Sequence, residues 1–203
     1  MANKKKMKNH EDIKEIILET TKKIIKDDGL DKVSIRRITN RMGYSPGIVY
    51  HYFSDKEEII NCIFNMGYQD IIMAVGEELN RDGNAREILD NSIDAYIEAV
   101  LKNSLEYKEI MNSNNTLIRE KTSLLYQGAK DSDKAIGMIV KNLNDGMSQG
   151  IYRKVDVELT SQIIWTTIFG FAFKMTQESV DDNYKKKLIK ALKNNIFSSL
   201  EKK

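Results

Sequence analysis

The chain has 203 residues, of which 41% are apolar and 31% are charged, and its formal net charge is only +2. This length and composition fit a folded protein with one core, or a small module attached to a medium one, and exclude a disordered chain. The single cysteine, Cys62, excludes an intramolecular disulfide and a Cys and His set for structural zinc, and it is expected to be a small buried apolar residue.

The charge is unevenly distributed along the chain. Residues 1–56 contain 13 Lys and Arg against 8 Asp and Glu, whereas the remaining residues contain 19 against 22. A basic first quarter on a mildly acidic body indicates two parts that meet different partners, and an anionic polymer suits the first part.

No segment has the pattern of a secretory signal or of a membrane-spanning helix. The N-terminal MANKKKMKN is basic, but no apolar core follows it, and nowhere do 18 apolar residues run uninterrupted. A cytoplasmic protein without a membrane partner is therefore expected.

Apolar residues recur at helical spacing over most of the chain, and Pro46 is its only proline, so the sequence predicts an all-α fold. The first predicted helix ends at Asp28-Gly29, because a glycine just beyond a helix commonly stops it. Its apolar stripe consists of Ile13, Ile16, Ile17, Thr20, Ile24 and Ile25.

A short second helix follows. Ser34 is predicted to cap it, and Ile35, Ile38 and Met42 are its inward positions. Gly43 is expected to break the helix after about two turns.

The third helix is also short. Tyr44 is expected to fill the turn before it as an apolar plug, and Ser45 is predicted to be its N-cap. Pro46 occupies the first helical position, where its fixed φ and missing N–H cost nothing. The helix is expected to continue to Phe53, and the residues predicted to pack inward are Ile48, Val49 and Phe53.

The segment SDKE is a capping box, with Ser54 as the cap and Glu57 three residues later, and it opens a longer fourth helix. The segments RDGN and NSNN mark breaks farther along. The helices expected in this body span residues 55–81, 85–102, 105–112, 116–128, 133–150, 156–178 and 183–201.

Two short helices joined by a glycine-containing turn, the second starting Ser-Pro-Gly, are typical of a helix-turn-helix that reads DNA. The second helix would brace the third, which would enter the major groove, while the helix N-termini at Ser34, Ser45 and Ser54 would offer N–H groups to phosphates. Residues 1–10, with Lys4, Lys5, Lys6 and Lys8, are predicted either to form a basic flexible arm that reaches DNA or to be a disordered solubilising tail.

Outward side chains of the third helix would contact phosphates and base edges, and nearby cations would contact the DNA backbone. The predicted contacts are Tyr50, His51 and Tyr52 on the helix, with Arg36, Arg37 and Lys56 at the backbone. The spacing equally fits a second interpretation, in which Tyr50 and Tyr52 are half-buried packing residues of a small helical bundle.

This stretch resembles the DNA-binding domain of the TetR family of bacterial transcriptional regulators. The sequence departs from the family pattern at Thr39 and Met42, where alanine is usual, and at Tyr44, where valine is usual; these core-side substitutions alter how the helices pack. The matching positions are Ser34, Ile38, Gly43, Ser45, Gly47, Tyr50, Tyr52, Phe53, Lys56 and Glu57.

The resemblance implies a three-helix DNA-binding domain over residues 1–56 and a larger helical-bundle domain for effector binding and dimerisation over residues 57–203. It also implies a homodimer that binds near-palindromic double-stranded DNA, acts as a repressor and is released by a small molecule. The residues at positions where such regulators touch DNA are Arg36, Ser45, Pro46, Gly47, Tyr50, His51, Tyr52 and Lys56.

The segment from Ile163 to Phe173 carries no charge, and at helical pitch its apolar groups fall on every side. The body can cover one side and a second copy of the chain can cover the other, so a homodimer is expected; a central helix in a monomer is the alternative. The last helix is expected to complete a four-helix interface through Tyr184, Leu188, Ile189, Leu192, Ile196, Phe197 and Leu200.

An effector would bind among aromatic and methionine side chains that are predicted to face the interior of the body. No buried acid or base indicates the charge or size of that effector, and for any single one of these side chains a place in a plain apolar core is the more frequent explanation. The candidates are Tyr68, Tyr96, Met111, Tyr126, Met138, Trp165 and Phe169.

An enzyme is not expected, and neither is a cofactor or a metal. His10 and His51 are the only histidines, and the sequence has no glycine-rich phosphate loop, metal-ligand spacing or paired nucleophile and base. Two alternatives to a ligand-responsive repressor remain: a DNA-bound dimer whose body binds a protein partner, and a helical bundle with no DNA role. An enclosed apolar cavity would favour the ligand, whereas a filled body with an exposed apolar patch would favour the protein partner.

Overall fold

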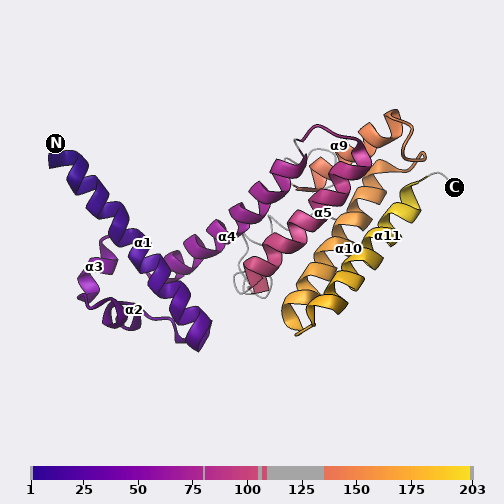
Figure 1. Cartoon of the computed structure of the whole chain (residues 1–203). Coiled ribbons are helices and arrows are strands. Elements are labelled where there is room, and N and C mark those ends of the chain that lie inside the picture. The colour runs from indigo at the N-terminus through magenta and orange to yellow at the C-terminus, as the bar shows by residue number, and fades with distance from the viewer. Residues whose placement is uncertain (1, 80, 105–106, 109–134, 202–203) are drawn as a thin grey trace. The chain divides into compact units, whose positions relative to one another are not determined.

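The computed structural model describes residues 2–79, 81–104, 107–108 and 135–201 (Figure 1). This described part of the chain is all-α, as predicted, and its β pairing is limited to an isolated bridge between Tyr152 and Glu201. The chain forms two compact units, residues 1–67 and 68–203, whose boundary lies inside helix α4 (Lys56–Leu79). The boundary predicted at residue 56 is the start of that helix, and the first turns of α4 bury Ile59 and Ile63 within the N-terminal unit.

Helix α1 (Ala2–Asp28) packs against helix α2 (Ile35–Met42) and the 3-10 turn η1 (Leu30–Lys32) through one apolar stripe. Ile16, which was predicted for this stripe, is 42% exposed, because the packed face is centred one position farther along. Over residues 12–28 of α1, the buried positions are Ile17, Leu18, Thr21, Ile24 and Ile25.

The first residues of the chain continue α1. The predicted basic flexible arm over residues 1–10 differs from the structure here, since the helix already begins at Ala2. This segment contains neither glycine nor proline, and its lysines and methionine favour a helix over irregular backbone.

A single 3-10 turn, η1 (Leu30–Lys32), leads to helices α2 (Ile35–Met42) and α3 (Pro46–Tyr50). Ser34 caps α2 as predicted, because its Oγ accepts a hydrogen bond from the Arg37 N–H at 3.2 Å. Helix α3 ends earlier than the predicted end at Phe53. The N–H groups of Tyr52 and Phe53 both donate to the Val49 carbonyl, at 2.9 and 3.0 Å, which closes α3 with a turn.

Helix α4 begins with a capping arrangement shifted by one residue from the predicted box. Asp55, and not Ser54, caps the helix, because its Oδ1 accepts from the Glu58 N–H at 2.8 Å. The Glu58 carboxylate in turn accepts from the Ser54 N–H at 2.6 Å and the Ser54 hydroxyl at 2.9 Å. The shift places Glu57 and Glu58 in the first turn, where acidic side chains interact favourably with the helix dipole.

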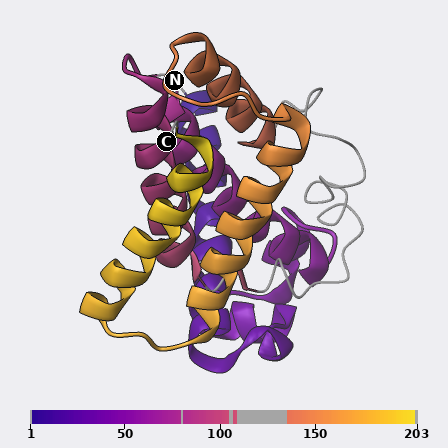
Figure 2. The ribbon, with the colours of Figure 1, turned by 90° about the vertical axis from the view of Figure 1, so that its right-hand side faces the viewer.

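The C-terminal unit is built around helix α5 (Ala85–Lys102), which packs against α9 (Ala135–Ser148), α10 (Val157–Gln177) and α11 (Asp182–Leu200). Figures 1 and 2 show α5, α10 and α11 running side by side. The expected helix over 116–128 lies outside the described residues, as does most of the one over 105–112. The apolar side chains at the centre of this unit include Leu89, Ile93, Leu143, Ile168 and Ile196.

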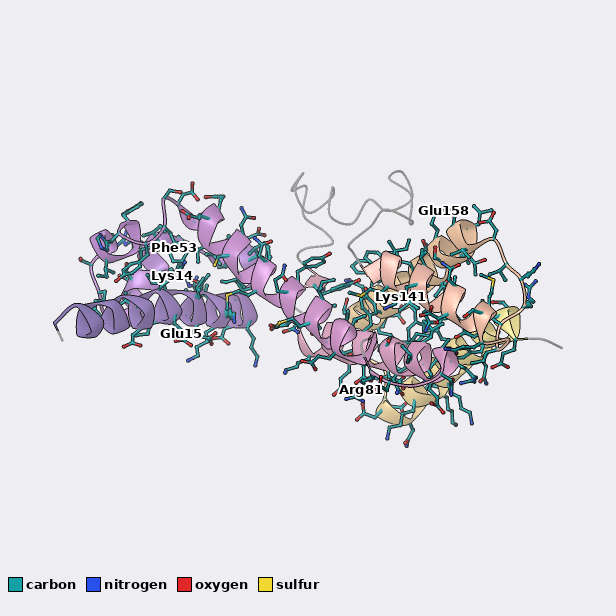
Figure 3. All side chains as sticks on the ribbon, turned by 90° about the horizontal axis from the view of Figure 1, so that it is seen from above. Lys14, Glu15, Phe53, Arg81, Lys141 and Glu158 are labelled. Atoms are coloured by element: carbon teal, nitrogen blue, oxygen red, sulfur yellow. The ribbon has the colours of Figure 1, made fainter. Side chains whose placement is uncertain are left out.

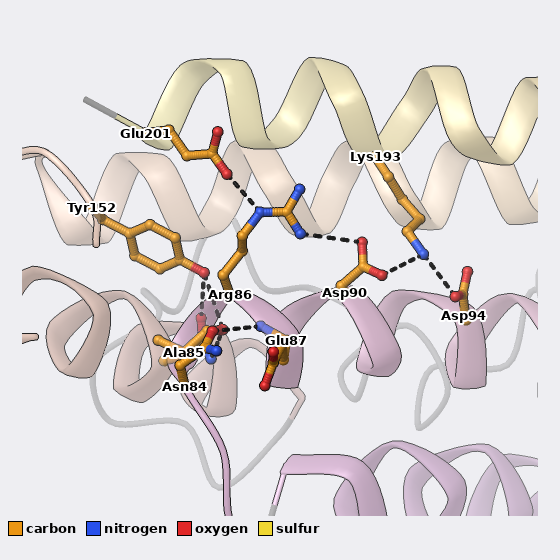
Figure 4. A network of polar contacts seen from close by, with 10 residues as sticks. Asn84, Ala85, Arg86, Glu87, Asp90, Asp94, Tyr152, Lys193 and Glu201 are labelled. Atoms are coloured by element: carbon orange, nitrogen blue, oxygen red, sulfur yellow. Dashed lines mark hydrogen bonds and ion pairs between the residues drawn. The ribbon is translucent and has the colours of Figure 1, made fainter. Parts of the chain in front are cut away.

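Polar contacts tie the end of α11 to the start of α5 (Figure 4). Arg86 Nε lies 2.6 Å from Glu201 Oε1, and Lys193 Nζ lies between Asp90 and Asp94, at 2.8 and 2.7 Å from their carboxylate oxygens. These contacts fix the register of two helices that are far apart in the sequence.

Candidate DNA interface and core cavity

The turn between α2 and α3 depends on Gly43. This residue ends α2 in the left-handed conformation, with φ 72° and ψ 28°, which residues with a side chain adopt only rarely. The N–H groups of Gly43 and Tyr44 both donate to the Thr39 carbonyl, which closes the turn. Tyr44, predicted to plug this turn, is instead exposed.

Helix α3 has one buried face and one exposed face. Val49 is fully buried and Phe53 is almost so, whereas Tyr50 is 59% exposed and His51 is also exposed. The packing interpretation of Tyr50 therefore does not fit its exposure. Tyr52 differs, because it is half-buried, and its ring meets that of His51 edge to face at 5.3 Å.

The residues that open α3 are exposed, as a DNA contact requires. Ser45, Pro46 and Gly47 all lie on the surface. Ser45 stands at the N-cap position, but its side chain accepts no capping hydrogen bond. Pro46 has no N–H, and the Ile48 N–H donates to the Ser45 carbonyl at 3.1 Å, so the group at this helix start that can donate to a phosphate oxygen is the Ser45 hydroxyl.

The predicted cationic contacts fall into two groups. Arg36 is exposed and forms no ion pair with a described residue, and Lys56 Nζ lies 3.7 Å from the carboxylate of its neighbour Glu57. Arg37, in contrast, lies 2.9 Å from Asp28 Oδ2. Arg36 and Arg37 were both predicted to contact the DNA backbone, but in the structure only Arg37 forms an ion pair with a described residue.

Sequence reasoning missed the arginine that completes this group. Arg41 NH1 donates to Asp27 Oδ2 at 2.9 Å, and Arg41 NH2 donates to Asp28 Oδ2 at 3.0 Å. A signal was present, because Asp27 and Asp28 occupy the last turn of α1, where carboxylates oppose the helix dipole. Carboxylates in that position are stabilised when a positively charged side chain from another element pairs with them.

A further cation contacts an aromatic residue near the end of α3. Lys14 Nζ lies 5.6 Å from the centre of the Phe53 ring (Figure 3). Phe53 is buried, so this contact joins α1 to the segment between α3 and α4.

The C-terminal unit contains a small apolar cavity of about 20 Å³, which is room for roughly one water molecule. Two of the predicted ligand residues, Tyr96 and Trp165, line it, and their rings lie 5.3 Å apart. Sequence reasoning did not single out the remaining lining residues, which are Val75, Leu89, Ser92, Ile93, Ile139 and Ile168.

The other ligand candidates are dispersed. Phe169 packs beside Trp165, with 6.2 Å between ring centres, and Met138 lines a separate polar groove with Arg81 and Lys141. Tyr68 is half-buried on α4, and burial raises its pKa. Met111 and Tyr126 lie outside the described residues.

A pair of buried hydroxyls lies beside the cavity. Tyr96 and Tyr107 are both buried, and their hydroxyl oxygens are 2.7 Å apart. Burial raises the pKa of each phenol, so both are neutral at physiological pH. One O–H is donated within the pair, and the second remains as a donor. Sequence reasoning named Tyr96 but not Tyr107.

Helix α10 presents an apolar face to solvent. Ile163 is 67% exposed and Leu159 is also exposed, whereas the adjacent Ile164 is only 3% exposed and packs in the core of the unit. The helix therefore has apolar residues on both sides, as predicted, and its own unit covers one of them.

Helix α11 differs in part from the predicted interface. Tyr184 is exposed, and Leu188 and Ile189 are half-buried. The other four predicted residues pack in the core of their own chain, because the inward stripe of α11 covers α5; they are Leu192, Ile196, Phe197 and Leu200.

Within the described ranges, no group of His, Cys, Asp and Glu side chains could hold a metal ion. The same residues include no helix that is long and apolar enough to cross a membrane. Cys62, expected to be buried, is half-buried and carries a free thiol.

Residues 17–63 match the family model described as bacterial regulatory proteins, tetR family. This range covers the C-terminal part of α1 from Ile17, the whole of α2 and α3, and the start of α4. The match therefore falls on the segment that carries the exposed residues of α3 and the arginines of α2.

Similarity to known proteins extends over the rest of the chain. The fatty acid metabolism regulator protein of Bacillus subtilis strain 168 is 22% identical over 156 residues, which cover 75% of this chain and 77% of that protein. A transcriptional regulator of the TetR/AcrR family from Thermobifida fusca YX-ER1 has a TM-score of 0.71 at 14% identity, with 92% of this chain and 97% of that chain covered. The ketosteroid transcriptional regulator KstR2 of Mycobacterium tuberculosis has a TM-score of 0.63 at 17% identity, with 94% and 95% covered.

Proposed function

Because the chain belongs to the TetR family of bacterial regulatory proteins, we propose that it is a ligand-responsive repressor that binds a near-palindromic operator as a homodimer. The observation that carries this proposal is the division of α3 into a buried face and an exposed one. Val49 anchors the helix in the N-terminal unit, while Tyr50 and His51 are exposed to reach base edges and phosphates.

The exposed apolar face of α10 supports the homodimer. Leu159, Ile163 and, on α11, Tyr184 are large apolar or aromatic side chains in contact with solvent in one chain. A second copy would cover them through the same face, which is the arrangement of a two-fold symmetric interface. Two copies of α3 about 34 Å apart would then read two half-sites one helical turn apart.

The effector is proposed to enter the apolar cavity of the C-terminal unit. The relatives named as regulators of fatty acid metabolism and as a ketosteroid regulator support an apolar molecule. Any such molecule exceeds the cavity of about 20 Å³, so binding must move the walls apart. Val75 of α4 is one of these walls, and α4 begins beside the helix-turn-helix at Lys56. Movement of α4 would alter the spacing of the two reading helices and weaken DNA binding.

The Tyr96 and Tyr107 pair indicates the polar group of the effector. If Tyr107 donates to Tyr96, the proton of Tyr96 is left for a ligand, and Tyr96 is the member of the pair that lines the cavity. No charged side chain is among the described residues that line the cavity. We therefore expect an uncharged apolar molecule with a hydrogen-bond acceptor, such as a carbonyl oxygen.

The chain itself supplies a probe of this site. Trp165 is the only tryptophan, and it lines the cavity, so its fluorescence reports occupancy there. We expect 2-nonanone to bind roughly fivefold more tightly than n-decane, which has as many non-hydrogen atoms, because one net hydrogen bond contributes about 1 kcal/mol. Tyr96→Phe should remove this preference, and Tyr107→Phe should retain most of it. Unchanged Trp165 fluorescence with both probes would count against the cavity as the effector site.

The small size of the cavity favours a second candidate function, in which the body binds a protein partner in place of a small molecule. Met73 on α4 is exposed in a groove with Asp70, Glu77 and Glu98, which a partner would cover. Failure of apolar probes to reach Trp165, together with intact operator binding, would favour this candidate.

Operator binding is tested directly with a fluorescently labelled duplex from upstream of the chain's own gene and a scrambled duplex, at two salt concentrations. The proposal expects tight preference for the native duplex and a steep dependence on salt. Equal and weak binding to both duplexes would contradict an operator at that position.

A further inference from the structure

Three ion pairs join the end of α1 to helix α2. Asp28 Oδ2 lies 2.9 Å from Arg37 and 3.0 Å from Arg41, and Asp27 Oδ2 lies 2.9 Å from Arg41. Arg41 thus uses two of its nitrogens on two different carboxylates. We define these four residues as the charge clamp.

The position of α2 gives the charge clamp a consequence for DNA. In a helix-turn-helix, the helix before the reading helix crosses the sugar-phosphate backbone. Each of its exposed cations would therefore release counterions from DNA of any sequence, and such contacts dominate non-specific affinity. The side chains of Arg37 and Arg41 remain 40% and 36% exposed, so both guanidinium groups are accessible from solvent.

Stability alone is a weak reason for the charge clamp. Its carboxylates sit in the last turn of α1, where the helix dipole disfavours them. Its members are all partly exposed, and ion pairs at such sites add little to folding. The acids do, however, remove two guanidinium groups from the set available to phosphates.

We propose that Asp27 and Asp28 hold Arg37 and Arg41 away from the DNA backbone and thereby lower affinity for DNA of arbitrary sequence. Arg36, which has no ion pair with a described residue, is then the arginine of α2 that contacts phosphate. The inference rests on the DNA-binding role of the helix-turn-helix, and it assigns to two acidic residues a part in discrimination between operator and other DNA.

The test is the Asp27→Asn and Asp28→Asn double variant with a labelled duplex of arbitrary sequence, titrated by fluorescence anisotropy at several salt concentrations. Release of two arginines should strengthen binding about tenfold at moderate salt and steepen the slope of log affinity against log salt by up to about 1.8. The matched control is Asp12→Asn with Glu15→Gln. These exposed acids lie on the same helix and form no ion pair with a described residue, so the control changes the net charge equally without freeing an arginine.

Equal gains in the two double variants would overturn the inference, because net charge alone would then explain them. The same Asp substitutions in a chain that lacks both arginines control for an effect of altered folding on DNA binding. With Arg37→Gln and Arg41→Gln already present, the Asp27 and Asp28 substitutions should give no more than the control gain, and a full gain there would also overturn the inference.

Absence of operator preference in the unaltered chain would count against the proposed operator and not against the charge clamp, since the duplex used here has no operator. Absence of binding to any duplex by all variants would overturn both.

Discussion

At the scale of single residues, neighbouring positions of α3 have opposite roles. Val49 is buried and Tyr50 is exposed, although one peptide bond separates them. Adjacent residues of a helix point about 100° apart, so a five-residue helix can divide its side chains between the core and a ligand surface. This division allows stability and DNA binding to be changed separately.

Tyr50→Ala should abolish preference for the operator and leave the free energy of unfolding within about 0.5 kcal/mol of the unaltered value, because the side chain is exposed. Val49→Ala is the comparison, and it should cost about 2 kcal/mol of stability through lost burial and a cavity. Anisotropy with labelled DNA and thermal unfolding provide the two readouts. A large drop in melting temperature for Tyr50→Ala would show that it is a packing residue.

At the scale of elements, α10 and α9 differ in the surroundings of one helix face: α10 has an apolar face exposed to solvent, and α9 has a face that is packed closely against its own unit. Consecutive residues belong to the two apolar sides of α10, since Ile163 is exposed to solvent and Ile164 is buried in the core. Helix α9 carries a different constraint, since a Cβ at Gly146 would overlap the ring of the buried Tyr152. The exposed face of α10 can therefore contact a second copy of the chain, whereas the space beside Gly146 of α9 is already filled by the Tyr152 ring.

Ile163→Glu should yield a folded monomer in sedimentation velocity, because a charged side chain cannot be buried against a second copy without a counter-charge. Ile164→Ala should instead lower the free energy of unfolding by about 2–5 kcal/mol, since a buried isoleucine side chain is lost. A stable dimer of Ile163→Glu would place the dimer interface on another face.

Gly146→Ala should destabilise the C-terminal unit by roughly 1–3 kcal/mol, because Tyr152 must move and disturb its hydrogen bond of 3.0 Å to the Ala85 carbonyl. Gly76→Ala on α4, where a Cβ would meet no atom within 4 Å, is the matched substitution and should be neutral or stabilising by up to about 1 kcal/mol. Chemical denaturation of both variants compares the two positions; equal stabilities would mean that the Tyr152 ring adapts without cost.

At the scale of the whole molecule, the proposed effector and DNA sites are coupled only if each ligand favours a different arrangement. Such coupling is reciprocal, so the factor by which an effector weakens DNA binding is the factor by which DNA weakens effector binding. The cavity walls from α4, α5, α9 and α10 would have to separate to admit a ligand. The energy for this separation comes from burial of the ligand's apolar surface.

Titration of Trp165 fluorescence with 2-nonanone should therefore give an apparent affinity that is about 5–150-fold weaker when operator DNA is saturating, the range of typical allosteric couplings. The same experiment with a scrambled duplex at equal concentration is the control. Identical affinities with and without operator would contradict coupling between the two sites.

The sequence predicted the fold class and most helix limits because spacing and caps are local properties. Helix α5 agrees with its expected range of 85–102, and Ser34 caps α2 as predicted. Local patterns did not reveal which charges pair: Arg37 and Arg41 meet acids from another helix, and Tyr96 meets Tyr107. The inward stripe of α11 was likewise assigned to a second copy, since periodicity shows that a face is buried and not which chain buries it. The DNA contacts themselves stay predictions.

The chain contains one tryptophan and one cysteine, and they belong to different units: Cys62 to residues 1–67 and Trp165 to residues 68–203. A dye coupled to the half-buried Cys62 thiol could accept excitation energy from the Trp165 indole without any added mutation. The efficiency of this transfer would follow the separation of the two units in solution, so the chain already contains a donor and an attachment site for an acceptor with which a change in that separation can be measured.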